Sequence, residues 1–91
     1  MRVRWTTEAA EDLTHIVQRI KEDNPEAAQR VARTIYTGVA ALTKSPYRGR
    51  DGLVGNTGEL IFPPWPYIAV YEVVKDQVQV LRIRHASQLW P

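Results

Sequence analysis

The chain has 91 residues, a net charge of +2 and no cysteine. That length fits one small domain spanning residues 1–91, and the lack of cysteine excludes disulfides and thiolate metal sites within it. A hydrophobic fraction of 44% is ordinary for a folded domain and argues against disorder. No apolar run reaches the length of a membrane span, and the N-terminus lacks the apolar region of a signal peptide. We therefore expect a cytoplasmic protein.

The first half of the sequence predicts a short strand and a helix. The strand covers Val3–Trp5, and Thr6 or Thr7 can cap the helix that follows. Apolar residues then recur at i, i+3, i+4 and i+7, which indicates one buried stripe on a helix. The residues of this stripe are Leu13, Ile16, Val17 and Ile20.

A second helix is predicted directly after the first. Asn24 is a good N-cap, and Pro25 suits the first helical position because the N–H group that it lacks would be unpaired there. Apolar residues continue at helical spacing to about Thr43, and Ser45-Pro46 ends the pattern. The two helices therefore form a hairpin.

The second half predicts a loop and three strands. Residues 45–57 are rich in Gly, Pro, Arg and Asn and read as a loop. A short strand over Glu59–Phe62 is expected at a sheet edge, because prolines 63, 64 and 66 cannot donate ladder hydrogen bonds. Strands over Tyr67–Val74 and Gln77–Arg84 follow. The order β-α-α-β-β-β predicts an α+β fold, with a helix hairpin packed on a mainly antiparallel twisted sheet.

Strict alternation divides the last strand into two faces. Leu81 and Ile83 share one face, and the other carries Val78, Val80, Arg82 and Arg84. The pattern alone does not decide which face meets the helices.

Several stretches, taken in order, resemble the RelE/ParE superfamily of toxins from type II toxin–antitoxin systems, including RelE/StbE-like plasmid stabilisation proteins. The stretches are AAEDL, NPEAA, LTKSPYRGR, GEL, PYIAVYEV and VLRIRHASQLWP, and together they cover nearly the whole chain. The resemblance implies a growth-inhibiting toxin that a cognate antitoxin neutralises. Members related to RelE cut messenger RNA on the ribosome, whereas members related to ParE inhibit DNA gyrase and are not nucleases. Fold alone does not choose between these targets.

The candidate catalytic residues lie near the end of the last two strands. Cleavage through the 2′-hydroxyl needs a base, an acid and cations, but no metal or cofactor. His85, Arg84, Arg82 and Tyr67 can be given these roles, so we lean toward a metal-independent endoribonuclease, with a ParE-like gyrase inhibitor as the alternative. A histidine that only ends a strand would look the same. His15, on the first helix, is expected to lie apart from this group.

Two further sets of residues are candidates for binding. Arg48 and Arg50 in the loop, with Tyr71 on a strand, can contact nucleic acid, although solvated charge and core packing would give the same pattern. Exposed aromatic and aliphatic residues on a small domain often mark an interface, so we expect antitoxin contacts from apolar side chains. These are Trp5, Trp65, Leu89 and Trp90.

The sequence also departs from the family pattern at basic positions. Gly58 stands where relatives commonly carry arginine, and Ile68 replaces an arginine of the RelE branch. Gly58 fits a bulge or strand entry that tolerates any backbone angle. Alternatively, its missing cation indicates a weakened or inactive toxin, in which case Gly58→Arg should raise toxicity.

Overall fold

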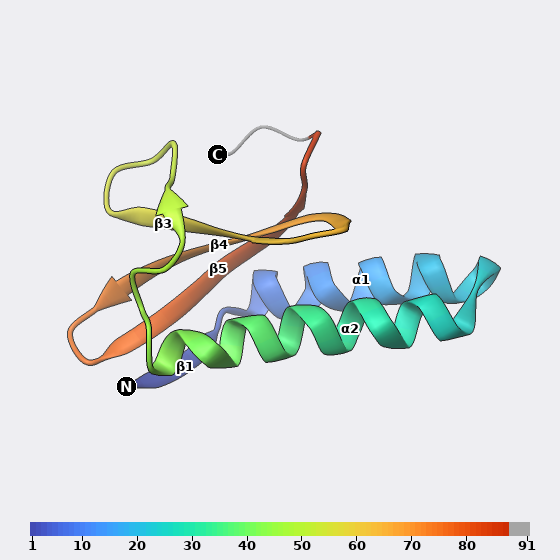
Figure 1. Ribbon diagram of the computed structural model, residues 1–91, viewed down its shortest axis with the longest axis horizontal. Coiled ribbons are helices and arrows are strands. Elements are labelled where there is room, and N and C mark those ends of the chain that lie inside the picture. The colour runs from blue at the N-terminus through green and yellow to red at the C-terminus, as the bar shows by residue number, and fades with distance from the viewer. Residues whose placement is uncertain (88–91) are drawn as a thin grey trace.

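The computed structural model describes residues 1–87 and packs two helices on one face of a five-stranded sheet (Figure 1). The predicted α+β class and element order are confirmed, with one short strand added. The elements are β1 (Arg2–Trp5), α1 (Thr7–Asp23), α2 (Pro25–Ala40), the 3-10 turn η1 (Ala41–Thr43), β2 (Arg50–Asp51), β3 (Thr57–Phe62), β4 (Trp65–Val74) and β5 (Gln77–His85). No helix within the described residues is long and apolar enough to cross a membrane.

Side-chain caps start both helices where the sequence predicts. The Thr6 hydroxyl accepts a hydrogen bond from the Ala9 N–H at 3.1 Å, and the Asn24 side-chain oxygen accepts one from the Ala27 N–H at 3.1 Å. Each cap pairs a donor that the first helical turn leaves unpaired. Pro25 occupies the first turn of α2. The hairpin is therefore set by local chemistry at residue 24, which ends one helix and starts the next.

The strand order is β1-β5-β4-β3-β2, with β1 parallel to β5 and the other neighbours antiparallel. The prediction of a plain loop over residues 45–57 was wrong, because β2 pairs Arg50 with Glu59 and Asp51 with Gly58. The start of β3 is thus paired on both sides rather than lying at the edge. β3 also begins earlier than predicted, at Thr57. A two-residue strand is too short to produce an alternating pattern in the sequence.

A β-bulge overturns the predicted division of faces on β5. Val70 pairs with Arg82 while Tyr71 pairs with Val80, so the intervening Leu81 has no counterpart on β4. One extra residue inverts the alternation beyond it. Val80 and Ile83 are consequently both buried in the core, although strict alternation predicts them on opposite faces.

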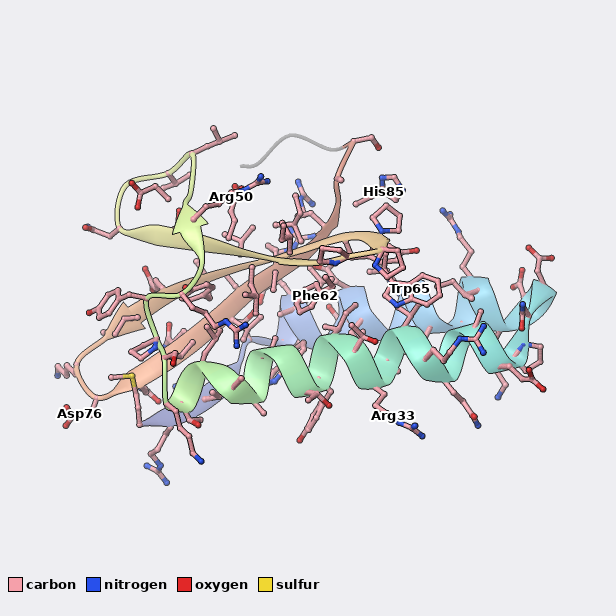
Figure 2. The ribbon with its side chains drawn as sticks, viewed as in Figure 1. Arg33, Arg50, Phe62, Trp65, Asp76 and His85 are labelled. Atoms are coloured by element: carbon pink, nitrogen blue, oxygen red, sulfur yellow. The ribbon has the colours of Figure 1, made fainter. Side chains whose placement is uncertain are left out.

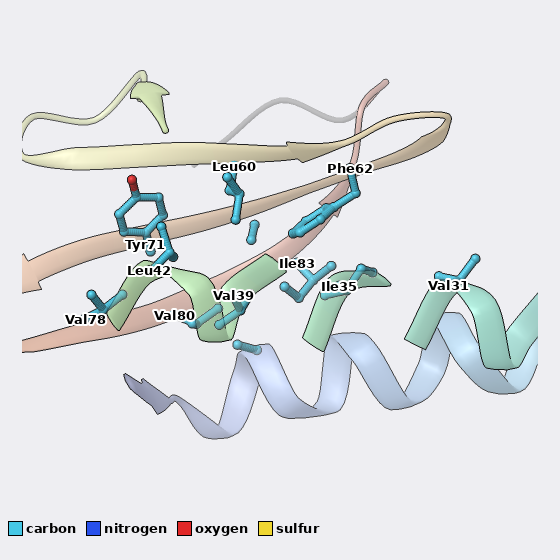
Figure 3. Close-up of a cluster of buried hydrophobic side chains, with 12 residues drawn as sticks. Val31, Ile35, Val39, Leu42, Leu60, Phe62, Tyr71, Val78, Val80 and Ile83 are labelled. Carbon is cyan, nitrogen blue, oxygen red and sulfur yellow. The ribbon is translucent and has the colours of Figure 1, made fainter. Parts of the chain in front are cut away.

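The core lies between the helix hairpin and the sheet (Figure 3). Burying each large aliphatic side chain there contributes about 1.5–3 kcal/mol relative to exposure. The half-buried stripe of α1, with Leu13, Ile16 and Ile20, packs against this core. The buried members of this core cluster are Val31, Ile35, Val39 and Leu42 from α2 and η1, Leu60, Phe62, Ala69, Tyr71, Val78, Val80 and Ile83 from the sheet, and Ala9 from α1.

Candidate functional site

A pocket of about 280 Å³ opens between α1 and the C-terminal half of β5. We call it the histidine pocket, because both histidines of the chain line it. Its lining residues are Asp12, His15, Ile16, Arg19, Tyr67, Arg82, Ile83, Arg84 and His85. All four residues predicted to be catalytic are therefore brought to one place.

One face of α1 forms a wall of the histidine pocket. Asp12, His15, Ile16 and Arg19 are spaced three, four and seven residues apart, which aligns their side chains. The expectation that His15 lies apart from the site was wrong. Its helical spacing from Asp12 and Arg19 is visible in the sequence. The sequence does not say, however, that this face of α1 meets β5.

Asp12 joins α1 to β5 just beyond the last residue pair between β1 and β5. β1 pairs with β5 only as far as Trp5 and Val80, so the ladder groups beyond that point need other partners. The Thr6 hydroxyl donates to the Leu81 carbonyl at 3.0 Å, and an Asp12 carboxylate oxygen accepts from the Ile83 N–H at 2.9 Å. The carboxylate of Asp12 thus takes the place of a strand at the open edge of β5.

Arg82 is held in a two-pronged ion pair with the same carboxylate. Its Nε and Nη2 atoms donate to the two Asp12 oxygens at 2.7 and 3.0 Å. Burial raises the pKa of Asp12. The opposite effect is larger and comes from the hydrogen bonds donated by Arg82 and the Ile83 N–H, together with the charges of Arg82 and Arg84. The pKa of Asp12 therefore lies below its ordinary value. The hydrogen bond to Asp12 likewise raises the pKa of the Arg82 guanidinium. Arg82 was predicted to be a catalytic cation; the structure pairs it with Asp12, and its catalytic role stays a prediction.

His85 and Tyr67 face each other across the last pair of strands. They are backbone partners, and their rings meet edge to face with centroids 5.7 Å apart. The Nδ1 atom of His85 accepts a hydrogen bond from the Ser87 N–H at 3.1 Å and lies 2.8 Å from the Ser87 hydroxyl oxygen. An Nδ1 that accepts from an N–H carries no proton, so the neutral ring carries its proton on Nε2. The neutral ring thus offers Nε2–H as a donor.

Arg84 adds positive charge to the same pocket. It stands opposite Ile68 in the ladder, one residue before His85. Its charge is among the causes that lower the pKa of Asp12, which places its electrostatic influence inside the pocket. Arg84, His85 and Tyr67 therefore remain together as predicted, joined by His15 and Arg19 from the helix.

Tyr71 lies outside the histidine pocket, in a tight slot between two glycines. Its side chain is only 3% exposed, and its hydroxyl accepts a hydrogen bond from the Gly49 N–H at 3.0 Å. A Cβ at Gly58 would lie 2.8 Å from the Tyr71 Cζ, and one at Gly49 would lie 2.6 Å from the hydroxyl oxygen. The prediction that Tyr71 contacts nucleic acid was wrong, because its ring cannot stack on a base from within the core.

The same slot explains Gly58 without invoking a lost cation. Gly58 has no positive φ, so backbone freedom is not the reason for glycine here. The Tyr71 ring covers the position that a side chain would fill. Packing against Tyr71 therefore accounts for glycine at this position. This replaces the expectation of a strand entry that tolerates any angle, and the weakened-toxin hypothesis stays a prediction.

The remaining described residues predicted to bind a partner lie apart from the histidine pocket. Arg50 donates from Nε to a Glu59 carboxylate oxygen at 3.0 Å, across β2 and β3, while Arg48 is exposed in the preceding loop. Trp5 and Trp65 are half-buried against the core, and Trp5 stacks on the exposed Tyr36 with ring centroids 6.3 Å apart. Their antitoxin role stays a prediction. Leu89 and Trp90 lie outside the described residues.

Comparison with known proteins identifies the family. Residues 3–90 match the family described as ParE toxin of type II toxin-antitoxin system, parDE. A putative toxin, Y4kP, from Sinorhizobium fredii is 42% identical, with 99% of this chain and 93% of that protein aligned. Toxin RelE2 from Caulobacter vibrioides is 40% identical, with 96% and 97% aligned.

Solved structures agree with this assignment. A chain described as the chromosomal ParDE TA system from P. aeruginosa superimposes with a TM-score of 0.86 at 29% identity, covering 96% of this chain and 97% of the other. The solution structure of a conserved hypothetical protein, HP0894 from Helicobacter pylori, gives a TM-score of 0.61 at 16% identity, covering 99% of each chain, and shares the fold. The chain thus belongs to the RelE/ParE superfamily, in the ParE family of type II toxin–antitoxin toxins.

Proposed function

We propose that this toxin, silenced by a cognate antitoxin, inhibits growth by binding DNA gyrase and does not cut messenger RNA. The observation that carries the proposal is the ion pair between Arg82 and Asp12. The guanidinium donates to both oxygens of a carboxylate, which also accepts from the Ile83 N–H. A cation needed to neutralise a phosphorane is thus engaged in holding α1 to β5.

The other expected catalytic groups support the same conclusion. RNA cleavage needs a base that can take the proton of the 2′-hydroxyl. The Nδ1 lone pair of His85 already accepts the Ser87 N–H, and its neutral Nε2 carries a proton, so the ring is arranged as a donor. Nuclease relatives are expected to carry arginine at two positions where this chain has Gly58 and Ile68, so neither position supplies a cation. The Tyr71 ring packs over Gly58. Among the described residues, His85 is thus arranged as a donor and no cation stands at position 58 or 68, which argues against cleavage at these positions.

Messenger RNA cleavage is the second candidate, and one observation favours it. The histidine pocket gathers His15, Arg19, Arg84 and His85 beside the hydroxyl of Tyr67, so groups able to move protons and bind phosphate are close together. Relatives named RelE1 and RelE2 from Caulobacter vibrioides, 30% and 40% identical, keep this alternative open.

The test is induction of the toxin without its antitoxin, comparing wild type with His85→Ala at matched protein levels. Plasmid supercoiling and transcript integrity are followed from the first minutes. We expect loss of supercoiling, full-length transcripts, and growth inhibition by His85→Ala that stays within about threefold of wild type. A general acid or base contributes about 10²–10⁴-fold to a cleavage rate. Cut transcripts together with a loss of that size in His85→Ala would overturn the proposal.

A further inference from the structure

We propose that the histidine pocket binds a phosphate group. The proposal does not depend on which cellular target the toxin inhibits. Its starting observation is that the only two histidines of the sequence, one near each end of the chain, line the same pocket of about 280 Å³. Five basic side chains from α1 and β5 line this pocket, and three of them are arginines, against a single carboxylate. This excess of positive charge is the feature that favours a ligand of opposite charge.

The basic side chains approach from two directions. His15 and Arg19 lie one turn apart on α1 and form one wall, while Arg84 and His85 come from the end of β5 and form the other. Tyr67, paired with His85 across the strands, adds a hydroxyl. Donors on two walls can reach several oxygens of one ligand at the same time.

The charge of the pocket favours an anion. Asp12 is the only carboxylate among the described lining residues, and the two hydrogen bonds from Arg82 neutralise it. Arg19 and Arg84 add two further positive charges to a lining that holds this single described carboxylate. Without the Asp12–Arg82 pair, a carboxylate at this position would repel an anion, so the structural ion pair also prepares the pocket.

The geometry favours phosphate over carboxylate. A phosphate presents oxygens in tetrahedral directions, whereas a carboxylate presents two oxygens in one plane, which suits a single forked arginine. The neutral His85 ring directs an Nε2–H donor, because its Nδ1 accepts from the Ser87 N–H. One water occupies about 30 Å³ in the liquid. A pocket of 280 Å³ therefore admits a phosphate together with an attached sugar or several waters.

The test uses the purified full-length toxin and the two imidazole signals in its NMR spectrum. Inorganic phosphate is titrated first, then a dinucleotide with one phosphodiester, then acetate. We expect both histidines to shift together with one saturating dissociation constant for a phosphate ligand. Tighter binding of the dinucleotide identifies the nucleic-acid backbone as the source, and binding of inorganic phosphate alone identifies free phosphate.

Matched arginine variants locate the site. Arg19 is exposed on the pocket side of α1, and Arg33 is exposed on α2, where Figure 2 places it on the opposite side of the molecule from His85. Removing one charged hydrogen bond corresponds to about a tenfold loss of affinity. We expect that loss in Arg19→Gln and no change in Arg33→Gln. Unchanged backbone amide signals elsewhere confirm that each variant is folded.

Three results would overturn the proposal. The first is the absence of a saturating shift of both histidines with either phosphate ligand. The second is acetate binding as tightly as phosphate, which would make the pocket a carboxylate site. The third is an equal loss in Arg19→Gln and Arg33→Gln, which would assign the effect to general surface charge.

Discussion

Tyr67 and Tyr71 lie four residues apart on the same face of β4, yet they belong to different parts of the molecule. Tyr71 is buried, with Gly49 and Gly58 against its ring. Tyr67 is half-buried and meets the edge of the exposed His85 ring at the mouth of a pocket. One face of β4 therefore carries a packed half, around Tyr71, and a half that lines the candidate site, around Tyr67, which we call the functional half.

The neighbouring residues, and not residue type or strand spacing, determine whether each tyrosine is buried in the core or lines the pocket. Two glycines on separate segments leave space for the Tyr71 ring, whose hydroxyl then pairs the Gly49 N–H. At Tyr67 the corresponding neighbour is a histidine, and α1 supplies the facing wall. Replacing the neighbours should therefore affect the two halves differently.

Gly58→Arg should have the largest effect, on the packed half. Its Cβ would lie within 2.8 Å of the Tyr71 ring, and the ring is held in the core. Overpacking of this kind costs about 3 kcal/mol of unfolding free energy. Urea denaturation of the purified toxin measures the loss, with Gly55→Arg as the control, because a Cβ at Gly55 meets nothing within 4 Å. Increased toxicity of a stably folded Gly58→Arg would contradict the packing explanation.

Asp12→Asn should have the next largest effect, on the functional half. The change removes the charge that pairs with Arg82 and weakens the hydrogen bond from the Ile83 N–H. Hydrogen bonds to charged groups contribute about 2 kcal/mol. We expect a loss of that size in urea denaturation, with faster amide exchange at Ile83. An unchanged exchange rate at Ile83 would show that Asp12 does not hold the edge of β5.

The same carboxylate predicts how stability depends on pH. The pKa of Asp12 is lowered in the folded state from its ordinary value of 3.8. Its stabilisation is therefore fully present above that value and is lost as the pH falls through the folded pKa. Unfolding free energies measured from about pH 6 down to about pH 2 should fall less steeply in Asp12→Asn than in wild type. If the unfolding free energies of wild type and Asp12→Asn fell in parallel with pH, the loss of stability in acid would come from other carboxylates.

Replacing each tyrosine with phenylalanine should give the smallest changes in stability, and comparing the two variants contrasts the two halves of β4 directly. Tyr71→Phe removes the acceptor of the Gly49 N–H and should cost about 1 kcal/mol. Tyr67→Phe keeps the ring against His85 and should stay within about 0.5 kcal/mol of wild type. Thermal denaturation of both variants, side by side, measures the difference. Equal losses would mean that the two halves of β4 are not distinct.

Much of the fold could be predicted from the sequence because its signals are local. Thr6, Asn24 and Pro25 fix the helix starts within a few residues, and alternation marks the two long strands. The bulge at Leu81 and the two-residue strand β2 left no such signal, because each depends on pairing with a distant segment.

The candidate site was predicted in part for the same reason. His85, Arg84 and Tyr67 were grouped correctly because adjacent antiparallel strands bring them together. The sequence did not reveal that Arg82 is engaged by Asp12, because that ion pair joins residues 70 positions apart. His15 was missed because only the docking of α1 on β5 brings it into the pocket.

We propose that the toxin inhibits its target by binding, because Arg82 and Tyr71 are held in structural contacts and His85 is arranged as a hydrogen-bond donor. The most direct measurement is a pair of reactions with purified toxin, one with DNA gyrase and plasmid, the other a translation extract with labelled messenger RNA. We expect inhibited supercoiling and intact RNA. Unimpaired supercoiling with RNA cut in the translating extract would contradict the proposal.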